Sequence, residues 1–213
     1  MTALKSGGDE GGAPTKAERT RARILDAAAR VLRDRGYGNT RLSDVAKIAS
    51  VQTAALYYHF DSREALIEEV VTLGQQRVYD HVVGELDRIG GGLDAIGRIR
   101  IAVKAHLEVT LRDSDHASAS IRTLGQLPAN IRRRQLEEQR KYGDVWRRLV
   151  NDAIDAGQAN PALRASSMRM LALGALNWVP EWWDSRQGSL TEIVEAAQTF
   201  IVEGLRAPSP GAR

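Results

Sequence analysis

The sequence predicts an all-α protein of about nine helices, and three observations carry that prediction. Apolar residues recur at spacings of three and four in one segment after another. No segment alternates polar and β-branched residues with the period of two that marks a strand. Ala, Leu, Arg and Glu, all good helix formers, dominate the composition. We expect a small N-terminal unit of three helices followed by a larger helical domain.

Composition narrows the class of protein. The chain has 213 residues, of which 43% are hydrophobic, enough for a substantial core. Cysteine is absent, so disulfides and thiolate sites are excluded. No apolar stretch approaches the roughly 18 residues of a membrane helix, and the Gly-rich start lacks the apolar segment of a secretory signal. We therefore expect a soluble, cytoplasmic protein with no membrane partner.

The N-terminal helices come in a clear order. Residues 1–15 are predicted to be a disordered extension. A first helix begins at Lys16 and should stop at Gly36, because its apolar stripe ends there. Asn39 and Thr40 are predicted to cap a second, short helix that ends at Ala49. Beyond it we expect a tight break at 50–52, a short helix over 53–60, and a long helix capped by Asp61 or Ser62, with Glu64 reaching back to the cap.

The rest of the chain is predicted to be helical as well. Gly90, Gly91 and Gly92 separate the long helix from the next one. The chain ends in two prolines and a glycine, so residues 207–213 are predicted to be a flexible tail. Apolar periodicity places the remaining helices at about 93–112, 114–124, 128–156, 161–184 and 189–205.

The two short helices joined by a tight turn, with a basic helix before them, form the pattern of a helix-turn-helix, whose second helix enters the major groove of DNA. Residues 1–60 hold ten Lys and Arg against six Asp and Glu, whereas the remainder holds twenty against twenty-one. Lys16 and Arg19 belong to this basic arm and suit a phosphate partner. A solvated helix face explains the same charges, and that alternative stays open.

Several spaced motifs then agree in register with one family. These are Ile24-Leu25-Asp26-Ala27-Ala28, Gly36-Tyr37, Thr40, Val45-Ala46, Val51, Leu56-Tyr57-Tyr58-His59-Phe60 and Ser62-Arg63-Glu64-Ala65-Leu66. Over about fifty residues the chain resembles the TetR family of transcriptional regulators. It departs from the family pattern at Ser50, where a turn glycine is common, and at Arg63, where lysine is usual. A residue other than glycine at positive φ costs about 1 kcal/mol.

The resemblance implies roles for individual residues. The residues expected to face base edges are Gln52, Thr53, Ala54 and Tyr57. Those expected to hold phosphates are Thr40, Tyr58, His59 and Arg63, with Arg41 as a further candidate. Phosphate contacts position such a module and base contacts specify the sequence. For any one of these residues, the alternative is an exposed side chain that contributes nothing to the free energy of DNA binding.

Beyond residue 62 the resemblance implies an effector-binding and dimerisation domain over 63–206, after a DNA-binding domain over 16–62. The family's last two long helices pair with those of a second copy, and the alternative is burial within the monomer. The expected interface residues are Leu171, Ala175, Ile193, Ala197, Phe200 and Ile201.

Candidate ligand residues are Arg122, Trp146, Trp178 and Trp182, although the tryptophans favour packing slightly over a cavity wall. The stretch 175–178, with Trp182 and Gly204-Leu205, resembles members that respond to acyl-CoA or other lipid-derived effectors. We therefore expect a hydrophobic or acyl-CoA-like effector.

The sequence favours a regulator over an enzyme. Its four histidines have no metal-ligand spacing, and it has no GxSxG, P-loop or Rossmann glycine pattern, so we expect no metal, no cofactor and no catalysis. The predicted function is a ligand-released repressor that binds a palindromic operator in double-stranded DNA as a homodimer. The alternative is a helical interaction or ligand-carrier module without DNA binding, which predicts loss of the basic arm and of the polar recognition helix.

Overall fold

The computed structural model describes residues 13–112 and 114–206, so the predicted tail and almost all of the predicted extension lie outside the described residues. The described residues hold nine α-helices, one short 3₁₀ turn and no strand, which confirms the all-α prediction. The elements are α1 (Lys16–Asn39), α2 (Leu42–Ala49), α3 (Thr53–His59), α4 (Arg63–Ile89), α5 (Ala95–Arg112), α6 (Ser114–Thr123), η1 (Leu124–Gln126), α7 (Ala129–Asp155), α8 (Ala165–Trp182) and α9 (Leu190–Leu205).

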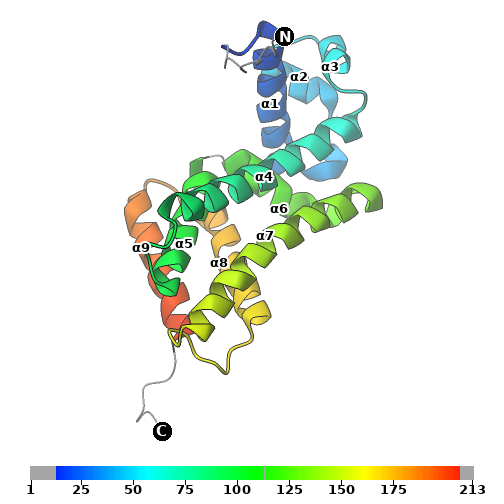
Figure 1. Cartoon of the computed structure of the whole chain (residues 1–213). Helices are drawn as coiled ribbons and strands as arrows, with labels where there is room; N and C mark the ends of the chain where they lie inside the picture. The colour runs from blue at the N-terminus through cyan, green and yellow to red at the C-terminus, as the bar shows by residue number, and fades with distance from the viewer. Residues whose placement is uncertain (1–12, 113, 207–213) are drawn as a thin grey trace, which may run out of the picture.

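The helices form two regions joined by α4 (Figure 1). Helices α1, α2 and α3 make the upper region, and α5, α7, α8 and α9 make the lower one. Helix α4 packs against α1 in the first region and against α5 and α7 in the second. Helix α6 has the same double relationship, because it contacts α1 as well as α5 and α8.

Helix α1 begins and ends as its sequence dictates. Thr15 and Glu18 form a reciprocal capping box, in which the Thr15 hydroxyl accepts from the Glu18 amide and the Glu18 carboxylate accepts from the Thr15 amide. Gly36 has φ 73°, a left-handed conformation that interrupts the helix, so the predicted stop at Gly36 is confirmed. The last residues up to Asn39 form a short continuation beyond this break.

One predicted cap is wrong, and another is confirmed without its expected partner. Helix α2 follows Arg41, which makes no side-chain cap, whereas the Thr40 hydroxyl donates to the Gly36 carbonyl at 2.8 Å. Ser62 does cap α4, accepting from the Ala65 amide at 3.0 Å, but Glu64 does not reach back to it. Glu64 lies one position too early for a capping box and interacts with the Tyr37 hydroxyl instead.

The hydrophobic side chains form two cores. The first joins α1, α2, α3 and the start of α4, and it also takes in Ala119, Leu127 and Ile131 from the later helices. The second joins the end of α4 with α5, α7, α8 and α9. Helix α4 therefore contributes to both cores, and the two regions are packed against each other through α4 and α6. The domain boundary at residue 62 stays a prediction.

Candidate nucleic-acid interface and cavity

The turn between α2 and α3 is held in a left-handed conformation. Ser50 has φ 55° and ψ 47°, the only positive φ of a residue other than glycine in the described part of the chain. Its neighbour Val51 donates its amide to the Ala46 carbonyl at 3.0 Å, which closes the turn. Ala46 and Ala49 are buried, and such small side chains let α3 cross α2 closely. The helix-turn-helix geometry expected from the sequence is therefore present.

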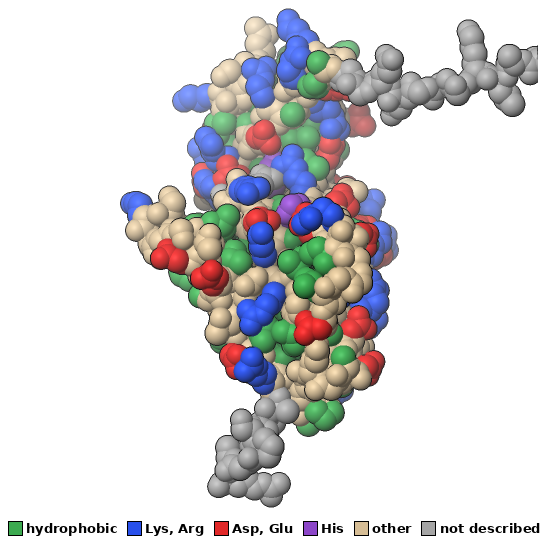
Figure 2. Space-filling view, turned by 60° about the vertical axis from the view of Figure 1, so that its left-hand side comes forward, with side chains coloured by type: hydrophobic (Ala, Val, Ile, Leu, Met, Phe, Trp, Pro, Cys, Tyr) green, Lys and Arg blue, Asp and Glu red, His purple; other side chains and the backbone are tan. Residues whose placement is uncertain are grey.

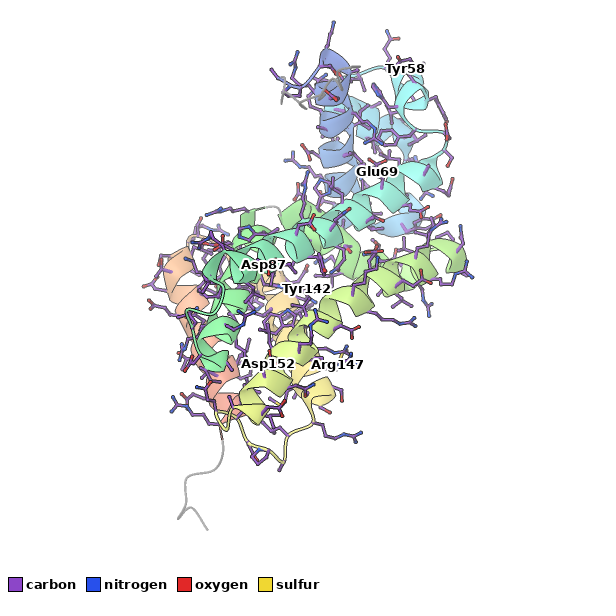
Figure 3. All side chains as sticks on the ribbon, in the orientation of Figure 1. Tyr58, Glu69, Asp87, Tyr142, Arg147 and Asp152 are labelled. Carbon is purple, nitrogen blue, oxygen red and sulfur yellow. The ribbon has the colours of Figure 1, made fainter. Side chains whose placement is uncertain are left out.

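Helix α3 has a buried side and an exposed side. Leu56 and the adjoining Phe60 are buried in the first core. On the other side Tyr57 is 60% exposed and Tyr58 is 83% exposed, and Tyr58 projects outward from the upper region (Figure 3). Large aromatic side chains rarely stand so far in water without a partner surface. The exposed side of α3 is therefore a candidate recognition surface.

Most of the other predicted DNA-binding residues share this exposed surface or flank it. His59 is half-buried and packs edge-on against Tyr58, with ring centroids 5.1 Å apart. Blue side chains are numerous over the upper region in Figure 2, as the basic arm predicts. The exposed residues are Lys16, Arg19, Arg41, Gln52, Thr53 and Ala54.

Thr40 is a correction. The resemblance predicts that Thr40 holds a phosphate, but only 2% of it is exposed and its hydroxyl is already donated to Gly36. The break at Gly36 turns the chain so that the Thr40 side chain points inward. In this structure Thr40 stabilises the start of the helix-turn-helix and presents no side-chain donor at the surface.

Arg63 is also used internally. Its guanidinium lies over the Tyr37 ring, 4.5 Å from the centroid, and donates to the Tyr37 carbonyl. Its Nε donates to the Thr40 carbonyl at 2.7 Å, and another of its nitrogens bonds Glu64 at 3.0 Å. The predicted phosphate contact is therefore wrong for this conformation, because Arg63 ties the end of α1 to the start of α4.

A cavity of about 420 Å³ lies in the lower region between α4, α5, α6, α7 and α8. Apolar walls come from Val78, Leu136 and Leu173, and polar groups come from His106 and Arg169, among others. This volume lies within the usual range of small-molecule sites, which are largely apolar with a few placed polar groups. The cavity is the candidate ligand site of the fold.

None of the four predicted ligand residues lines this cavity. Trp146 is fully buried in the second core, while Trp178 and Trp182 are exposed on α8. Arg122 reaches across to Glu181 at 2.5 Å and so joins α6 to α8. Sequence spacing shows which residues share a helix face and not which side of the molecule that face occupies, so it did not reveal which residues line this cavity.

The sequence analysis did not predict the polar residues that line the cavity. His106 is 1% exposed, and its Nδ1 lies 2.8 Å from the Tyr142 hydroxyl, which points into the lower region from α7 (Figure 3). Burial lowers the pKa of His106 to about 4, against a smaller opposing effect of Asn177, so the ring is neutral near pH 7. Burial also raises the pKa of Tyr142. One signal was present for Arg169, which is the only charged residue between Arg164 and Glu181.

A separate apolar surface covers α8 and α9. Phe200 is 70% exposed, and Leu171, Trp178 and Trp182 are exposed as well. Figure 2 brings the α9 side of the molecule forward and shows hydrophobic side chains among basic ones on the lower region. Of the predicted interface residues, Ala175, Ile193 and Ala197 are half-buried. Ile201 is a correction, because it points inward and is buried in the monomer's second core.

Membrane spans and metal clusters are both missing from the described chain. Within residues 13–112 and 114–206, no helix combines the length and the apolarity needed to cross a membrane. Over the same residues, no three His, Asp or Glu side chains gather as metal ligands would. The candidate functional surfaces among the described residues are the α3 face, the cavity and the apolar α8–α9 surface.

An exposed recognition helix above an internal cavity defines the class of ligand-sensing helix-turn-helix proteins. Residues 24–70 match the family described as bacterial regulatory proteins, tetR family, and residues 92–205 match the tetracyclin repressor-like C-terminal domain. The chain therefore belongs to the TetR family, and it is a DNA-binding transcriptional regulator.

Individual relatives agree with this assignment. The transcriptional repressor KstR2 of Rhodococcus jostii is 28% identical over 196 residues, covering 88% of this chain and 92% of the relative. The fatty acid metabolism regulator protein of Bacillus subtilis is 19% identical, covering 85% and 93%. The solved structure of the ketosteroid transcriptional regulator KstR2 of Mycobacterium tuberculosis superimposes with a TM-score of 0.77 at 16% identity, covering 88% of this chain and 95% of that one. TetR-family regulators bind operators and effector ligands and act as dimers.

Proposed function

We propose that this regulator is a repressor that binds a palindromic operator as a homodimer and is released from DNA by a small molecule in its cavity. The observation that carries the proposal is the position of α6. One side of α6 packs against α1 of the helix-turn-helix, and Ala117, Ser120 and Ile121 of the same helix line the cavity. A ligand that fills the cavity must contact the helix that supports the DNA-binding region.

The DNA-binding part of the proposal assigns two kinds of contact. Gln52, Thr53, Ala54 and Tyr57 read base edges, with Ala54 limited to a thymine methyl because it has no hydrogen-bonding side chain. Phosphates are held by Tyr58, His59 and the exposed cations Lys16, Arg19 and Arg41. Residues 16–62 act as the DNA-binding domain and residues 63–206 as the effector-binding and dimerisation domain.

Dimerisation follows from the apolar surface on α8 and α9. Exposed Trp178 and Phe200 suit an interface core, where aromatic residues are enriched. A two-fold dimer presents two α3 helices about 34–36 Å apart, which matches successive major grooves of a palindrome. A second copy therefore both covers the apolar surface and supplies the second half-site contact.

The effector is proposed to be lipid-derived, with an apolar body. The largely apolar cavity supports this, and so do the names of two relatives, one a ketosteroid regulator and one a fatty acid metabolism regulator. Binding shifts the equilibrium toward a dimer with a different α3 separation, and affinity for DNA falls by a coupling free energy of about 1–3 kcal/mol. The proposed function needs no catalytic step, and we propose that the protein acts in the cytoplasm, where it would meet its operator.

Selection from random double-stranded DNA tests the proposed function. The expected product is an inverted repeat whose half-sites are separated by about 10 base pairs or a multiple of that spacing. Gln52→Ala should relax base preference at one position of each half-site, whereas Arg41→Ala should weaken all sequences alike. Arg148→Ala, an exposed cation on α7, is the matched control and should change neither. Failure to enrich any sequence would contradict the proposal.

A further inference from the structure

The charges around the cavity have one sign. Arg140 and Arg169 line it, and none of its described lining residues is Asp or Glu. Within residues 13–112 and 114–206, neither guanidinium lies within ion-pair distance of a carboxylate, although Arg134 and Arg147 of α7 do. Two cationic and no anionic described side chains therefore line the cavity, which favours an anionic occupant.

Arg169, which lines the cavity, has a donor atom without a partner. Its Nε is buried and has no hydrogen-bond partner, and the contact of another of its nitrogens, 3.7 Å from the Met170 sulfur, is weak. A buried donor without a partner is costly, and the cost is larger for a charged group. An anionic oxygen supplied by a ligand would remove this cost and would form the bidentate pairing that guanidinium groups favour.

The absence of a side chain at Gly143 leaves the space that the Arg169 guanidinium occupies. A Cβ built on Gly143 would lie 2.8 Å from an Arg169 terminal nitrogen, closer than side-chain carbons are found to approach. The guanidinium therefore rests directly on the backbone of α7, in a space that only glycine leaves open. Arg169 is thus seated against the residue that follows Tyr142, the hydrogen-bond partner of His106.

His106 brings a second polar side chain to the cavity. Its Nδ1 is occupied by Tyr142, and its buried Nε2 makes no hydrogen bond of good geometry, although Asn177, which also lines the cavity, is close enough to raise the pKa of the ring. A guanidinium and an imidazole in one largely apolar cavity are more than apolar packing requires. Together they favour a ligand with oxygen atoms at one end and an apolar body at the other.

We propose that the effector is an amphipathic anion whose carboxylate or phosphate oxygens pair with Arg169, while its apolar body lies against Val78, Leu136 and Leu173. This inference rests on the proposed function, which makes the occupant an effector, and it concerns the same cavity. A free fatty carboxylate and an acyl-coenzyme A both offer anionic oxygens on an apolar body, so the experiment separates these two sources.

The test measures, by calorimetry, how tightly four small probes bind to the full-length dimer without DNA. The four probes have the same alkyl chain and differ in the group at its end. The probes are decanoate, decanoyl-coenzyme A, decanol and decylamine. At least one anion should bind about tenfold tighter than decanol, since a hydrogen bond to a charged group contributes about that much, and decylamine should bind least. The tighter anion identifies the source. Equal binding of all four probes, or no binding by either anion, would overturn the proposal.

Variants make the test specific to Arg169. Arg169→Met keeps the apolar stem and should abolish the preference for the anion over decanol, with decanol itself changed by less than about twofold. Arg169→Lys should restore part of the preference, as a point charge without the planar fork. The control Arg148→Met removes an exposed arginine that does not line the cavity and should keep the full preference. An unchanged preference in Arg169→Met would refute the assignment.

Gly143→Ala provides an independent variant with Arg169 intact. Alanine is a better helix former than glycine, so α7 should not be weakened by propensity, but the new methyl group displaces the guanidinium. The anion preference should fall toward that of Arg169→Met while circular dichroism stays unchanged. A full anion preference in this variant would contradict the seating of Arg169 on Gly143.

The outcome is separable from that of the proposed function. Anion-selective binding through Arg169 without release of DNA would sustain this inference and refute ligand-induced release. DNA release by a neutral lipid, with no preference for anions, would refute this inference alone.

Discussion

Nε2 of His116 on α6 lies 3.0 Å from Oδ1 of Asp26 on α1, across the junction between the two regions. The His116 ring is buried, whereas the Asp26 carboxylate is 64% exposed. Close by, Asp115 forms ion pairs with Arg30 and Arg33 of α1. Ala117, which follows His116, lines the cavity. Under the proposed function, a ligand that displaces α6 would therefore act on α1 through these contacts.

Asp26→Ala should therefore weaken the coupling between effector and DNA more than it weakens either binding event. The exposed carboxylate itself contributes little, and the loss of a partner for His116 should cost at most about 1–3 kcal/mol of stability, so the fold and the DNA affinity should persist. The DNA affinity is measured without and with decanoate or decanoyl-coenzyme A, whichever releases DNA. The coupling free energy calculated from the ratio of the two affinities should fall by about 0.5–2 kcal/mol. Fluorescence anisotropy measures the ratio, and Asp87→Ala on α4 is the matched control. An unchanged ratio would rule out this contact as a link.

Stability should fall between pH 6.5 and pH 4 because of His106. Its pKa is about 4 in the folded protein and 6.5 when exposed, so the unfolded chain binds the extra proton first and unfolding is favoured as the pH falls. The difference corresponds to about 3 kcal/mol. Urea denaturation at several pH values should show a shallower pH dependence for His106→Leu than for the wild type, and identical slopes would contradict the argument.

Ser50→Gly should stabilise the protein. Ser50 holds φ 55°, a conformation that costs most residues about 1 kcal/mol, and glycine relieves it at the expense of some unfolded-state entropy. The net gain should be a few tenths of a kcal/mol, visible as a higher melting temperature. Ser43→Gly, at an exposed helical position of α2, should lower the free energy of unfolding by about 0.5–1 kcal/mol and so lower the melting temperature. A lower melting temperature for Ser50→Gly would show that the turn is not strained.

Substitution of Arg63 should affect stability, whereas substitution of Arg41 should affect DNA binding. Arg63→Ala removes the bonds to the Tyr37 and Thr40 carbonyls, so it should lower the free energy of unfolding by about 1–3 kcal/mol. Arg41→Ala removes an exposed cation and should lower DNA affinity and its salt dependence without changing stability. Thermal melts and anisotropy titrations of both variants provide the comparison. A stable Arg63→Ala with reduced affinity would instead restore the phosphate role.

Phe200→Asp should dissociate the dimer. Phe200 is 70% exposed in the single chain, and a charge placed there would be buried without a partner in the proposed α8–α9 interface. Analytical ultracentrifugation should show monomers, and operator affinity should fall with the loss of the second half-site. Leu93→Asp, at an exposed apolar residue that belongs to neither α8 nor α9, should remain dimeric. A dimeric Phe200→Asp would move the interface elsewhere.

Local signals in the sequence predicted the elements well. Gly36 and Ser50 mark breaks in the helical pattern, and both have positive φ. The exposure of Tyr57 and Tyr58 agrees with the DNA-facing roles that the resemblance implies, and the spacing of four between the buried Leu56 and Phe60 leaves them on the other side of α3. Each of these features depends on neighbours within one helical turn, where sequence periodicity is informative.

The cavity depends on contacts between distant helices, which periodicity does not reveal. Arg122 was a candidate because its charge suits an anion, yet Glu181, far along the chain, takes it. Trp146 and Trp178 lie in helices of clear periodicity, but one is buried and the other exposed. The predicted cap at Thr40 is wrong for a related reason. The break in the helix at Gly36 brings the Gly36 carbonyl close to the Thr40 hydroxyl, which donates to it instead of capping α2.

The most direct test is the binding of the purified protein to its own upstream DNA at two salt concentrations, with the double variant Tyr57→Ala, Tyr58→Ala alongside. These side chains are 60% and 83% exposed, so their loss should leave the fold intact. The account predicts tight binding that weakens with salt in the wild type and is largely lost in the variant. If the variant binds as tightly as the wild type, with the same salt dependence, then α3 is not the recognition helix and the central claim is wrong.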